Sequence, residues 1–349
     1  MSKLKFGDLT YVCKNPFKLN NGINIESKED KPENLYKYYS PNENNFNAVA
    51  NNNLFCSHPF HFNDLTDSTP LSYDFKNLTY EDFENYYDGL LLDKNLLLLI
   101  YEDDKLNLFR SHCNHYYSEL NSMLGFISLT KNEMNNLMWG HYSGDSGFKI
   151  KFNTEKLIRS INEKNDQNCL FFPIKYIENK LHIDTSKYGT YFPLLVDIST
   201  KVNDWEYENE WRIVVDKSDM SVPESLVSLR DDYKGENNRF VSYDADSIEE
   251  IVLGFHFFNG KNFANQKIIT TEEFRIDAKS QDVTNLLKFI CNNKKIIIRK
   301  AGIKVGSEEN TLIPNTKHLK RSLEGIEIKH ISHFTFSVLR LNRNEVQEF

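Results

Sequence analysis

One nine-residue segment constrains this chain more than any other stretch. It reads Asp204-Trp-Glu-Tyr-Glu-Asn-Glu-Trp-Arg212 and combines four acids, three large aromatic residues and an arginine. A core strand has no use for so many charges, and a solvated loop has no use for two tryptophans. A site that sets a carboxylate against an aromatic wall requires both, so the segment predicts such a site.

The totals bound the size of the protein and its partners. The chain has 349 residues, enough for about two domains or one large one. Its net charge of −8 gives no general basic patch for nucleic acid. The segment from Lys288 to Arg343 is locally basic, which we interpret as a solvated surface, with a local groove as the alternative.

Cysteine use and hydropathy indicate the compartment. The five cysteines are widely spaced and form no CxxC, which is typical of a reduced, intracellular protein. The first residues lack the apolar core of a signal peptide. The most apolar run, residues 89–100, is too short and too polar to span a bilayer. We therefore expect a cytoplasmic protein with no membrane partner.

Short strands separated by helices of unequal length predict the fold class. The strands are expected at 35–39, 54–57, 125–130, 147–152, 171–176, 211–215, 240–243 and 248–254. The helices are expected at about 41–51, 80–123 and 132–142, and in the last one Leu137, Met138 and His141 would share a face. This pattern favours an α+β fold with a mixed, mostly antiparallel sheet and flanking helices.

Composition divides the chain into three parts. Residues 1–34 are polar and are predicted to be a weakly structured lead-in. Residues 35–257 carry the α+β pattern. Residues 258–349 form a C-terminal extension or a small second domain, with strands at 296–299 and 330–340.

Three motifs in this order resemble a known bacterial family. The first joins Leu35-Tyr-Lys-Tyr-Tyr39 to Leu54-Phe-Cys-Ser-His-Pro-Phe-His-Phe-Asn-Asp-Leu-Thr-Asp67. The second is Leu137-Met-Trp-Gly-His-Tyr142, framed by Phe126-Ile-Ser-Leu-Thr130 and Gly147-Phe-Lys-Ile-Lys-Phe152. The third is Lys201-Val-Asn-Asp-Trp-Glu-Tyr-Glu-Asn-Glu-Trp-Arg212. Together they span residues 35–255 and are similar to the family catalogued as domain of unknown function number 2971. Tyr39 and Leu65 depart from its pattern, which has a basic residue and a proline there.

The resemblance implies a bacterial protein linked to phage defence and toxin-like contexts. The order of motifs also resembles ADP-ribosyltransferase-like folds. In those, a basic or His residue on an early strand, an aromatic or Ser element in the middle and a Glu on a later strand serve one site. That second similarity implies an ADP-ribosyltransferase-like core, NAD as the substrate and a protein or nucleic acid as the acceptor. Fold similarity alone does not fix function.

NAD chemistry would give several residues defined roles. Breaking the nicotinamide–ribose bond passes through an oxocarbenium-like state, which a nearby carboxylate stabilises. Glu210, at the start of the 211–215 strand, is the first catalytic candidate, and Glu208 would lie two residues earlier on the same strand face. His141 is the third. The candidate substrate-binding residues are Tyr36, Lys37, Asn63, Asp64, Ser128, Thr130, Trp139, Tyr142 and Arg212.

The residues of the first two motifs also have structural interpretations. Trp139 and Tyr142 would stack on the nicotinamide ring, but large aromatics more often fill cores. His141 and Lys37 would contact ribose or phosphate, but a histidine on a helix is often structural. Ser128 and Thr130 would orient the amide, or they are ordinary strand residues.

The acidic residues have structural interpretations too. Glu208 and Glu210 would pair with Arg212 and Lys201 at a surface. The Asn63–Asp67 stretch would be a turn or a helix cap, because Asn and Asp side chains readily bond their own backbone.

We expect an enzyme that consumes NAD, and two other functions stay open. A metal-dependent nuclease would use Asp64, Asp67, Glu208 and Glu210 to bind Mg²⁺. A non-catalytic module would sense a nucleotide or a protein of a defence system through an aromatic cleft.

The common sequence signatures of other enzymes do not occur. The chain contains no GxGxxG, GxxxxGK[ST], HExxH or GxSxG. The pairs His58/His61 and His112/His115 have a spacing that suits zinc, but no cysteine pair completes a tetrahedral set. We therefore expect no metal.

Overall fold

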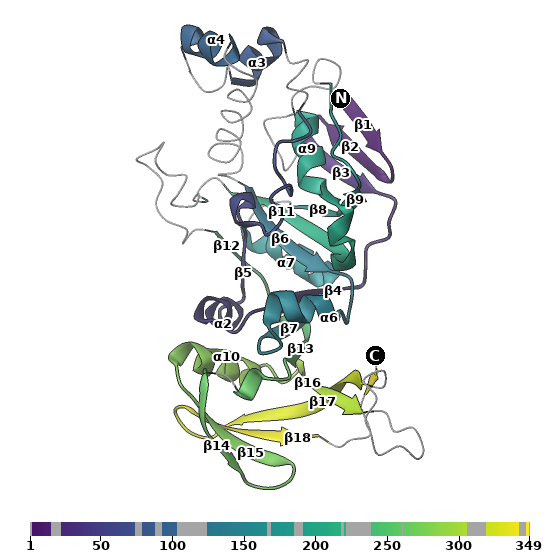
Figure 1. The fold of residues 1–349 in the computed structure, drawn as a ribbon. Helices are drawn as coiled ribbons and strands as arrows, with labels where there is room; N and C mark the ends of the chain where they lie inside the picture. Colours follow the sequence, from purple (N-terminus) through teal and green to yellow (C-terminus); the bar gives the residue numbers. More distant parts are fainter. Residues whose placement is uncertain are drawn as a thin grey trace. The chain divides into compact units, whose positions relative to one another are not determined.

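The fold is described from a computed structural model, whose helices and strands are drawn in Figure 1. The chain divides into two compact units. The described residues are 2–14, 22–73, 79–87, 93–102, 124–165, 169–184, 191–217, 220, 239–259, 261–305, 319–341 and 347–348. The first unit comprises Met1–Lys31, Phe55–Leu129 and Asn165–Val241, and the second comprises Pro32–Leu54, Thr130–Lys164 and Ser242–Phe349. The units differ from the predicted division, because residues 258–349 fold together with parts of residues 35–257.

The first unit is built on three neighbouring strands in the order β6-β11-β8. Their bounds are β6 (Leu124–Thr130), β8 (Leu170–Pro173) and β11 (Glu210–Asp216). β11 runs antiparallel to β8, and a shorter parallel pair joins β9 (Lys175–Ile177) to β10 (Thr200–Val202). The helices of this unit are η1 (Pro59–His61), α3 (Tyr80–Tyr87), α4 (Lys94–Glu102), α9 (Tyr191–Ser199) and η5 (Asn203–Glu208). Of the helix expected at 80–123, α3 and α4 are described, and residues 103–123 lie outside the described residues.

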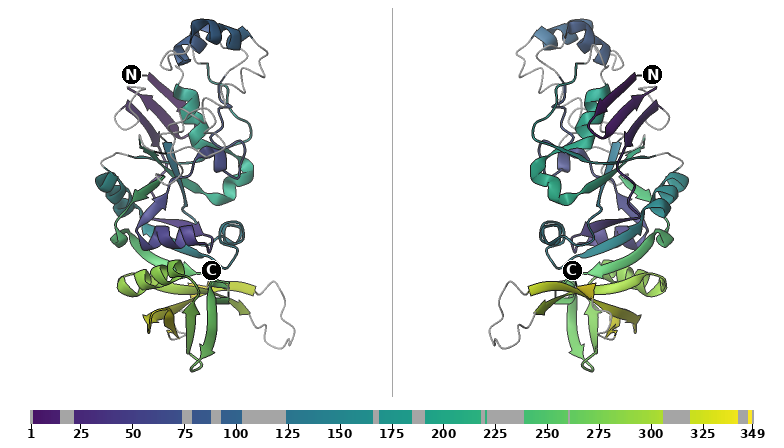
Figure 2. Two further views of the ribbon diagram at one scale, coloured as in Figure 1. Left: turned by 90° about the vertical axis from the view of Figure 1, so that its left-hand side faces the viewer. Right: turned by 90° about the vertical axis from the view of Figure 1, so that its right-hand side faces the viewer.

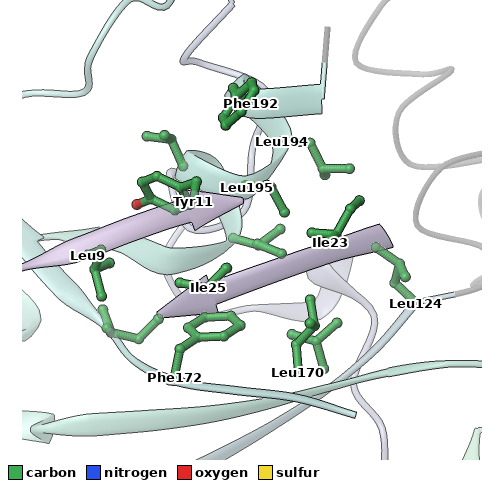
Figure 3. Packing of buried hydrophobic residues seen from close by; sticks show 14 of the residues in the cluster. Leu9, Tyr11, Ile23, Ile25, Leu124, Leu170, Phe172, Phe192, Leu194 and Leu195 are labelled. Carbon is green, nitrogen blue, oxygen red and sulfur yellow. The ribbon is translucent and has the colours of Figure 1, made fainter. Parts of the chain in front are cut away.

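The prediction of a weakly structured lead-in is wrong. β1 (Ser2–Phe6), β2 (Leu9–Cys13) and β3 (Ile23–Ser27) form an antiparallel sheet. Leu9 and Tyr11 of β2 and Ile23 and Ile25 of β3 are buried against residues of β8 and α9 (Figure 3). The physical reason is alternation with a period of two, which a polar average over the segment conceals.

The second unit contains the strand order β14-β15-β18-β17-β16-β13-β7-β4. The strand bounds are β4 (Asn34–Tyr39), β7 (Phe148–Asn153), β13 (Ile248–Leu253), β14 (Phe263–Ile268), β15 (Glu273–Ala278), β16 (Ile297–Val305), β17 (Leu319–His330) and β18 (Thr335–Arg340). β13 and β16 are parallel, and the other neighbours in this order are antiparallel. A short strand, β19 (Gln347–Glu348), also pairs with β17. These sheets confirm the predicted α+β fold with a mixed, mostly antiparallel sheet.

Helices flank this second sheet. They are α2 (Glu43–Ala50), α6 (Asn136–Met138), the π-helical turn η4 (Trp139–Ser143), α7 (Thr154–Asn165), η8 (Ala245–Ser247), η9 (Phe257–Asn259) and α10 (Gln281–Asn292). α10 lies beside the strands drawn in yellow in both turned views (Figure 2). Its Asp282 accepts a hydrogen bond of 2.6 Å from the Asn47 side chain of α2, which fixes the two helices to each other.

Two elements of this unit differ from their predictions. The strand expected at 330–340 is a hairpin, because β17 ends at His330 and β18 begins at Thr335; the apolar alternation on both sides of the turn hides the reversal. The helix expected at 132–142 is α-helical only at 136–138 and continues as a π turn. Leu137 is exposed there and Met138 is buried, so the two do not share a face.

One further pair of short strands completes the described sheets. β5 (Asn53–Phe55) pairs with β12 (Phe240–Ser242). Among the described residues, no helix is long and apolar enough to cross a membrane.

Candidate functional site: a buried charge network

The start of β11 is set by a sharp reversal of the backbone. η5 ends at Glu208, and Asn209 follows with a φ of +43°, a left-handed conformation that asparagine tolerates better than most residues. Glu210 then opens the strand, and its N–H donates to the Tyr176 hydroxyl at 2.9 Å. Because of this reversal, the prediction that Glu208 and Glu210 share one strand face is wrong.

The two glutamates nevertheless meet at a common cation. The Nζ of Lys201 lies 2.8 Å from Oε2 of Glu208 and 2.6 Å from Oε2 of Glu210. It also lies 3.3 Å from Oδ2 of Asp67, which comes from the loop after η1. The predicted pairing is therefore present, but it is buried rather than at a surface, since Glu208 and Glu210 are 4% and 3% exposed.

Arg212 is the second cation of the network. Its Nη1 and Nη2 donate to the two carboxylate oxygens of Asp67 at 2.9 and 2.8 Å, and its Nε donates to Oε1 of Glu210 at 2.8 Å. Nη1 also donates to the Ser68 hydroxyl and to the Ile198 carbonyl. This two-pronged pairing is the strong form of an arginine–carboxylate contact.

The environment of Arg212 excludes it from the predicted substrate contact. The side chain has no exposed surface, and the rings of Phe62 and Phe126 lie 5.3 and 5.8 Å from its guanidinium carbon. Each of its three nitrogens already donates to the protein. Arg212 therefore holds Asp67 and Glu210 in place rather than binding a ligand.

The charge network is defined here as Asp67, Lys201, Glu208, Glu210 and Arg212. Three carboxylates face two cations, so the network carries one excess negative charge when all five groups are ionised. Taking ions out of water is costly, and buried ion pairs are weak contributors to stability on balance. Stability alone is therefore a weak explanation for this network.

The pKa values show which members keep their charges. Burial raises the pKa of Glu210, but the charges of Arg212 and Lys201 outweigh it and bring the pKa down to about 2. Burial lowers the pKa of Lys201, but Glu210 and Asp67 raise it well above the ordinary value. Glu210 is therefore an anion and Lys201 a cation throughout the neutral range.

Another buried acid, outside the charge network, holds the same loop. Asp197 of α9 has no exposed surface, and its two oxygens accept the Ser72 N–H at 3.0 and 3.3 Å. Burial raises the pKa of Asp197 to about 7, against the lowering effect of Lys180. The loop is thus held at Asp67 by Arg212 and at Ser72 by Asp197.

Beside the network, η5 carries a pair of partly exposed rings. The centroids of Trp205 and Tyr207 lie 6.1 Å apart with an interplanar angle of 32°. The Nζ of Lys201 lies 5.7 Å from the centroid of the Trp205 ring. Asp204 and Glu206, on either side of Trp205 in the sequence, are exposed.

The structure places Trp139, His141 and Tyr142 of the second motif in the second unit. Trp139 has no exposed surface and packs edge-on against Tyr38 at 5.2 Å, so its faces offer nothing to a nicotinamide ring. His141 is exposed on the π turn, and Tyr142 is half-buried. Glu210 belongs to the first unit, and Trp139 and His141 belong to the second.

Two more predicted ligands of the second unit lie on β4. Tyr36 is buried, with the Lys149 Nζ 4.8 Å from its ring centroid. Lys37 is half-buried, with its Nζ 5.7 Å from the ring of Tyr39.

The remaining predicted residues have local roles. Asp64 accepts from the N–H and the hydroxyl of Thr66, both at 2.8 Å, which is the turn that its sequence suggested, and Asn63 is exposed. The hydroxyl of Thr130 accepts the Asn132 N–H at 3.0 Å. Ser128 is half-buried in β6.

Sequence reasoning does not find the contacts of two buried acids, Asp67 and Asp197. The sequence suggests a turn, a cap or a magnesium ligand for Asp67, whereas the structure pairs it with Arg212. Asp197 was not singled out, although one acid inside the apolar run Phe192-Pro-Leu-Leu-Val-Asp-Ile198 was a visible anomaly. Both contacts join residues more than a hundred positions apart.

The described residues offer no metal site. Within them, no group of three or more His, Cys, Asp or Glu side chains is arranged to hold a metal ion. Three carboxylates do converge, but on the ammonium of Lys201. His58 is buried, and its Nδ1 accepts the Phe60 N–H at 3.1 Å, which caps η1.

Comparison with known proteins supports the family resemblance. Residues 138–213 match the profile of the family described as protein of unknown function (DUF2971), which confirms the resemblance inferred from the motifs. No curated protein and no solved structure matched the chain. The similarity to ADP-ribosyltransferase-like folds stays a prediction.

Proposed function

We propose that this chain, a relative of that uncharacterised family, is an NAD-consuming enzyme of the ADP-ribosyltransferase or NAD glycohydrolase type. The observation that carries the proposal is the excess negative charge of the charge network, with Glu210 held ionised inside it. A toxin or effector in defence against phage, acting in the cytoplasm on a protein or nucleic-acid acceptor, is the biological role that we propose with it.

The chemistry explains why an ionised carboxylate suits this reaction. Cleavage of the nicotinamide–ribose bond develops positive charge on the ribose, and a fixed anion nearby lowers that barrier. With its pKa at about 2, Glu210 is suited to this electrostatic role and not to proton donation. Glu208 adds a second carboxylate on Lys201.

The neighbours of Glu210 would act as positioning residues. Arg212 fixes one oxygen of Glu210 and is itself fixed by both oxygens of Asp67. The carboxylate therefore has little freedom to reorient, so its charge would act on a ribose bound beside the network without prior rearrangement of Glu210.

The direct test is release of nicotinamide from NAD by the purified full chain. Glu210→Gln should lower the rate by about 10²–10³-fold, the usual loss for one electrostatic contact in a transition state. Glu178→Gln removes an exposed acid of the same unit and should leave the rate unchanged. NAD that stays intact with the wild-type chain at high concentration, with protein and nucleic-acid acceptors present, would contradict the proposal.

A second candidate function is a non-catalytic module that senses a nucleotide or a protein. One observation favours it: every carboxylate of the charge network already faces a cation, and all three are almost fully buried. This candidate predicts that a nucleotide raises the melting temperature of the chain while no turnover occurs. A ligand at about 100 times its Kd should stabilise the folded state by about 2.7 kcal/mol.

A further inference from the structure

The chain has three tryptophans, and the structure separates one from the other two. Trp139 and Trp211 are buried, with 0% and 2% of their surface exposed. Trp205 on η5 is partly exposed, and Tyr207 beside it is partly exposed as well. Large rings that keep open surface next to one another provide apolar contact area for a ligand.

The charges around this ring pair select the kind of ligand. Asp204 and Glu206 are exposed and precede and follow Trp205 in the sequence. The one cation recorded at the Trp205 ring among the described residues is Lys201, whose charge is more than balanced by the three carboxylates it contacts. The rings therefore lie in a locally negative environment.

Aromatic faces in a negative environment bind organic cations. The electron-rich face of a tryptophan attracts a cation, and nearby carboxylates add to the attraction at longer range. The same carboxylates repel phosphate, so the phosphates of any nucleotide bound here would have to lie away from these rings.

We propose that Trp205 and Tyr207 form a binding surface for an organic cation. We define the η5 surface as Asp204, Trp205, Glu206 and Tyr207. Two sources share the required chemistry: the pyridinium ring of oxidised NAD, and the guanidinium or ammonium group of an acceptor side chain. The identity of the ligand rests on the proposed function. The binding itself does not, because it can be measured without turnover.

The position of the surface fits this role. Lys201 connects it to the proposed reacting acid, because its Nζ contacts Glu210 at 2.6 Å and lies 5.7 Å from the Trp205 ring. A cation bound on the rings would thus be close to the carboxylate that the proposed reaction uses. This assigns to Trp205 the ring contact that sequence reasoning gave to Trp139.

Binding is tested by isothermal titration of the full chain with small probes. N-methylnicotinamide cation represents the pyridinium source, and N-acetylarginine methyl ester represents the acceptor source. Neutral nicotinamide is the matched uncharged ring. At least one cation should bind at least tenfold more tightly than neutral nicotinamide, and which of the two binds identifies the source.

Variants locate the binding on the η5 surface. Trp205→Ala should weaken cation binding by about tenfold or more, and Trp205→Phe should restore part of it because a ring returns. Asp204→Asn combined with Glu206→Gln should weaken binding and reduce its salt dependence. Phe60→Ala removes another exposed ring of the same unit and should leave binding unchanged.

Fluorescence gives an independent readout. Because Trp205 is the partly exposed tryptophan, the pyridinium probe should quench the emission that Trp205→Phe removes. Equal affinity for charged and neutral rings, no saturable binding of either cation, or unchanged binding in Trp205→Ala would overturn the inference.

The outcomes separate this inference from the proposed function. Cation binding that depends on Trp205, without nicotinamide release by the wild-type chain, sustains the surface and removes the NAD activity. Nicotinamide release that is unchanged in Trp205→Ala, without cation binding by the wild-type chain, sustains the NAD activity and removes the binding surface.

Discussion

In the first unit, five charged side chains meet below the surface, whereas in the second the buried residues around Phe148 are mostly rings. Tyr39 stacks on Phe148 at 5.0 Å and 10°, and Phe46 lies 6.0 Å away on the same ring. Rings require a filled volume, but ion pairs require particular atoms at particular places. The comparison teaches that the first unit should tolerate substitution at its centre far less than the second.

Among substitutions that keep the character of the side chain, Arg212→Lys should have the largest effect on stability. Lysine keeps the charge but cannot supply the fork that holds Asp67 and Glu210, so about 3–5 kcal/mol of unfolding free energy should be lost. Urea unfolding of the full chain measures it. Arg159→Lys, at an exposed position of α7, is the matched control. A loss below about 1 kcal/mol would mean that the network is less demanding than its geometry implies.

Asp197→Asn should change the pH dependence of stability. Its folded pKa of about 7 lies above the unfolded value near 4, so the folded form binds more protons between these values and stability falls as pH rises from 4 to 7. Asparagine cannot ionise, yet its oxygen still accepts the Ser72 N–H.

The Asp197→Asn variant should therefore gain about 2–4 kcal/mol relative to wild type between pH 5 and pH 8. Urea unfolding at the two pH values measures the difference. A difference between the two proteins that does not change with pH would show that Asp197 is not a titrating group in this range.

Phe148→Leu should have a smaller effect, because an apolar side chain of similar bulk can repack among the rings. The expected loss is about 1–1.5 kcal/mol, against about 3–5 kcal/mol for Phe148→Ala. The same unfolding assay compares the two variants. A leucine loss as large as the Arg212→Lys loss would erase the contrast between the two units.

Lys164→Ala should have the smallest effect. Lys164 pairs with Asp244 at 2.8 Å, but both side chains are more than 40% exposed. Such pairs contribute less than about 0.5 kcal/mol and weaken with salt. A loss above about 1.5 kcal/mol in 0.15 M salt would show that the distance between the charged atoms predicts the contribution of an ion pair to stability better than burial does.

The same contrast explains what the sequence could predict. Strands 147–152 and 211–215 were found because alternation of apolar residues is a local property. The pairing of Glu208 and Glu210 with Lys201 and Arg212 followed from opposite charges close together in the chain. Their burial did not follow, because it depends on what covers them.

Contacts between distant residues were beyond such reasoning. Asp67 lies 145 positions before Arg212. The residues next to Asp67 in the sequence do not show whether its carboxylate caps a turn or pairs with an arginine. Trp139 is an aromatic example of the same limit. A sequence pattern does not distinguish a tryptophan that fills a core from one that binds a ligand.

The order in which the units are completed has a consequence for synthesis. The chain crosses between them several times, so neither unit is a continuous stretch, and no truncation yields one alone. β13 begins at Ile248 and pairs with the edge of β7 that β4 does not occupy. On the ribosome, β4 and β7 therefore emerge long before β13. At ordinary translation speed that edge waits about 5–20 s for its partner. An uncovered strand edge invites pairing with other chains, so nascent copies should depend on chaperones during that interval.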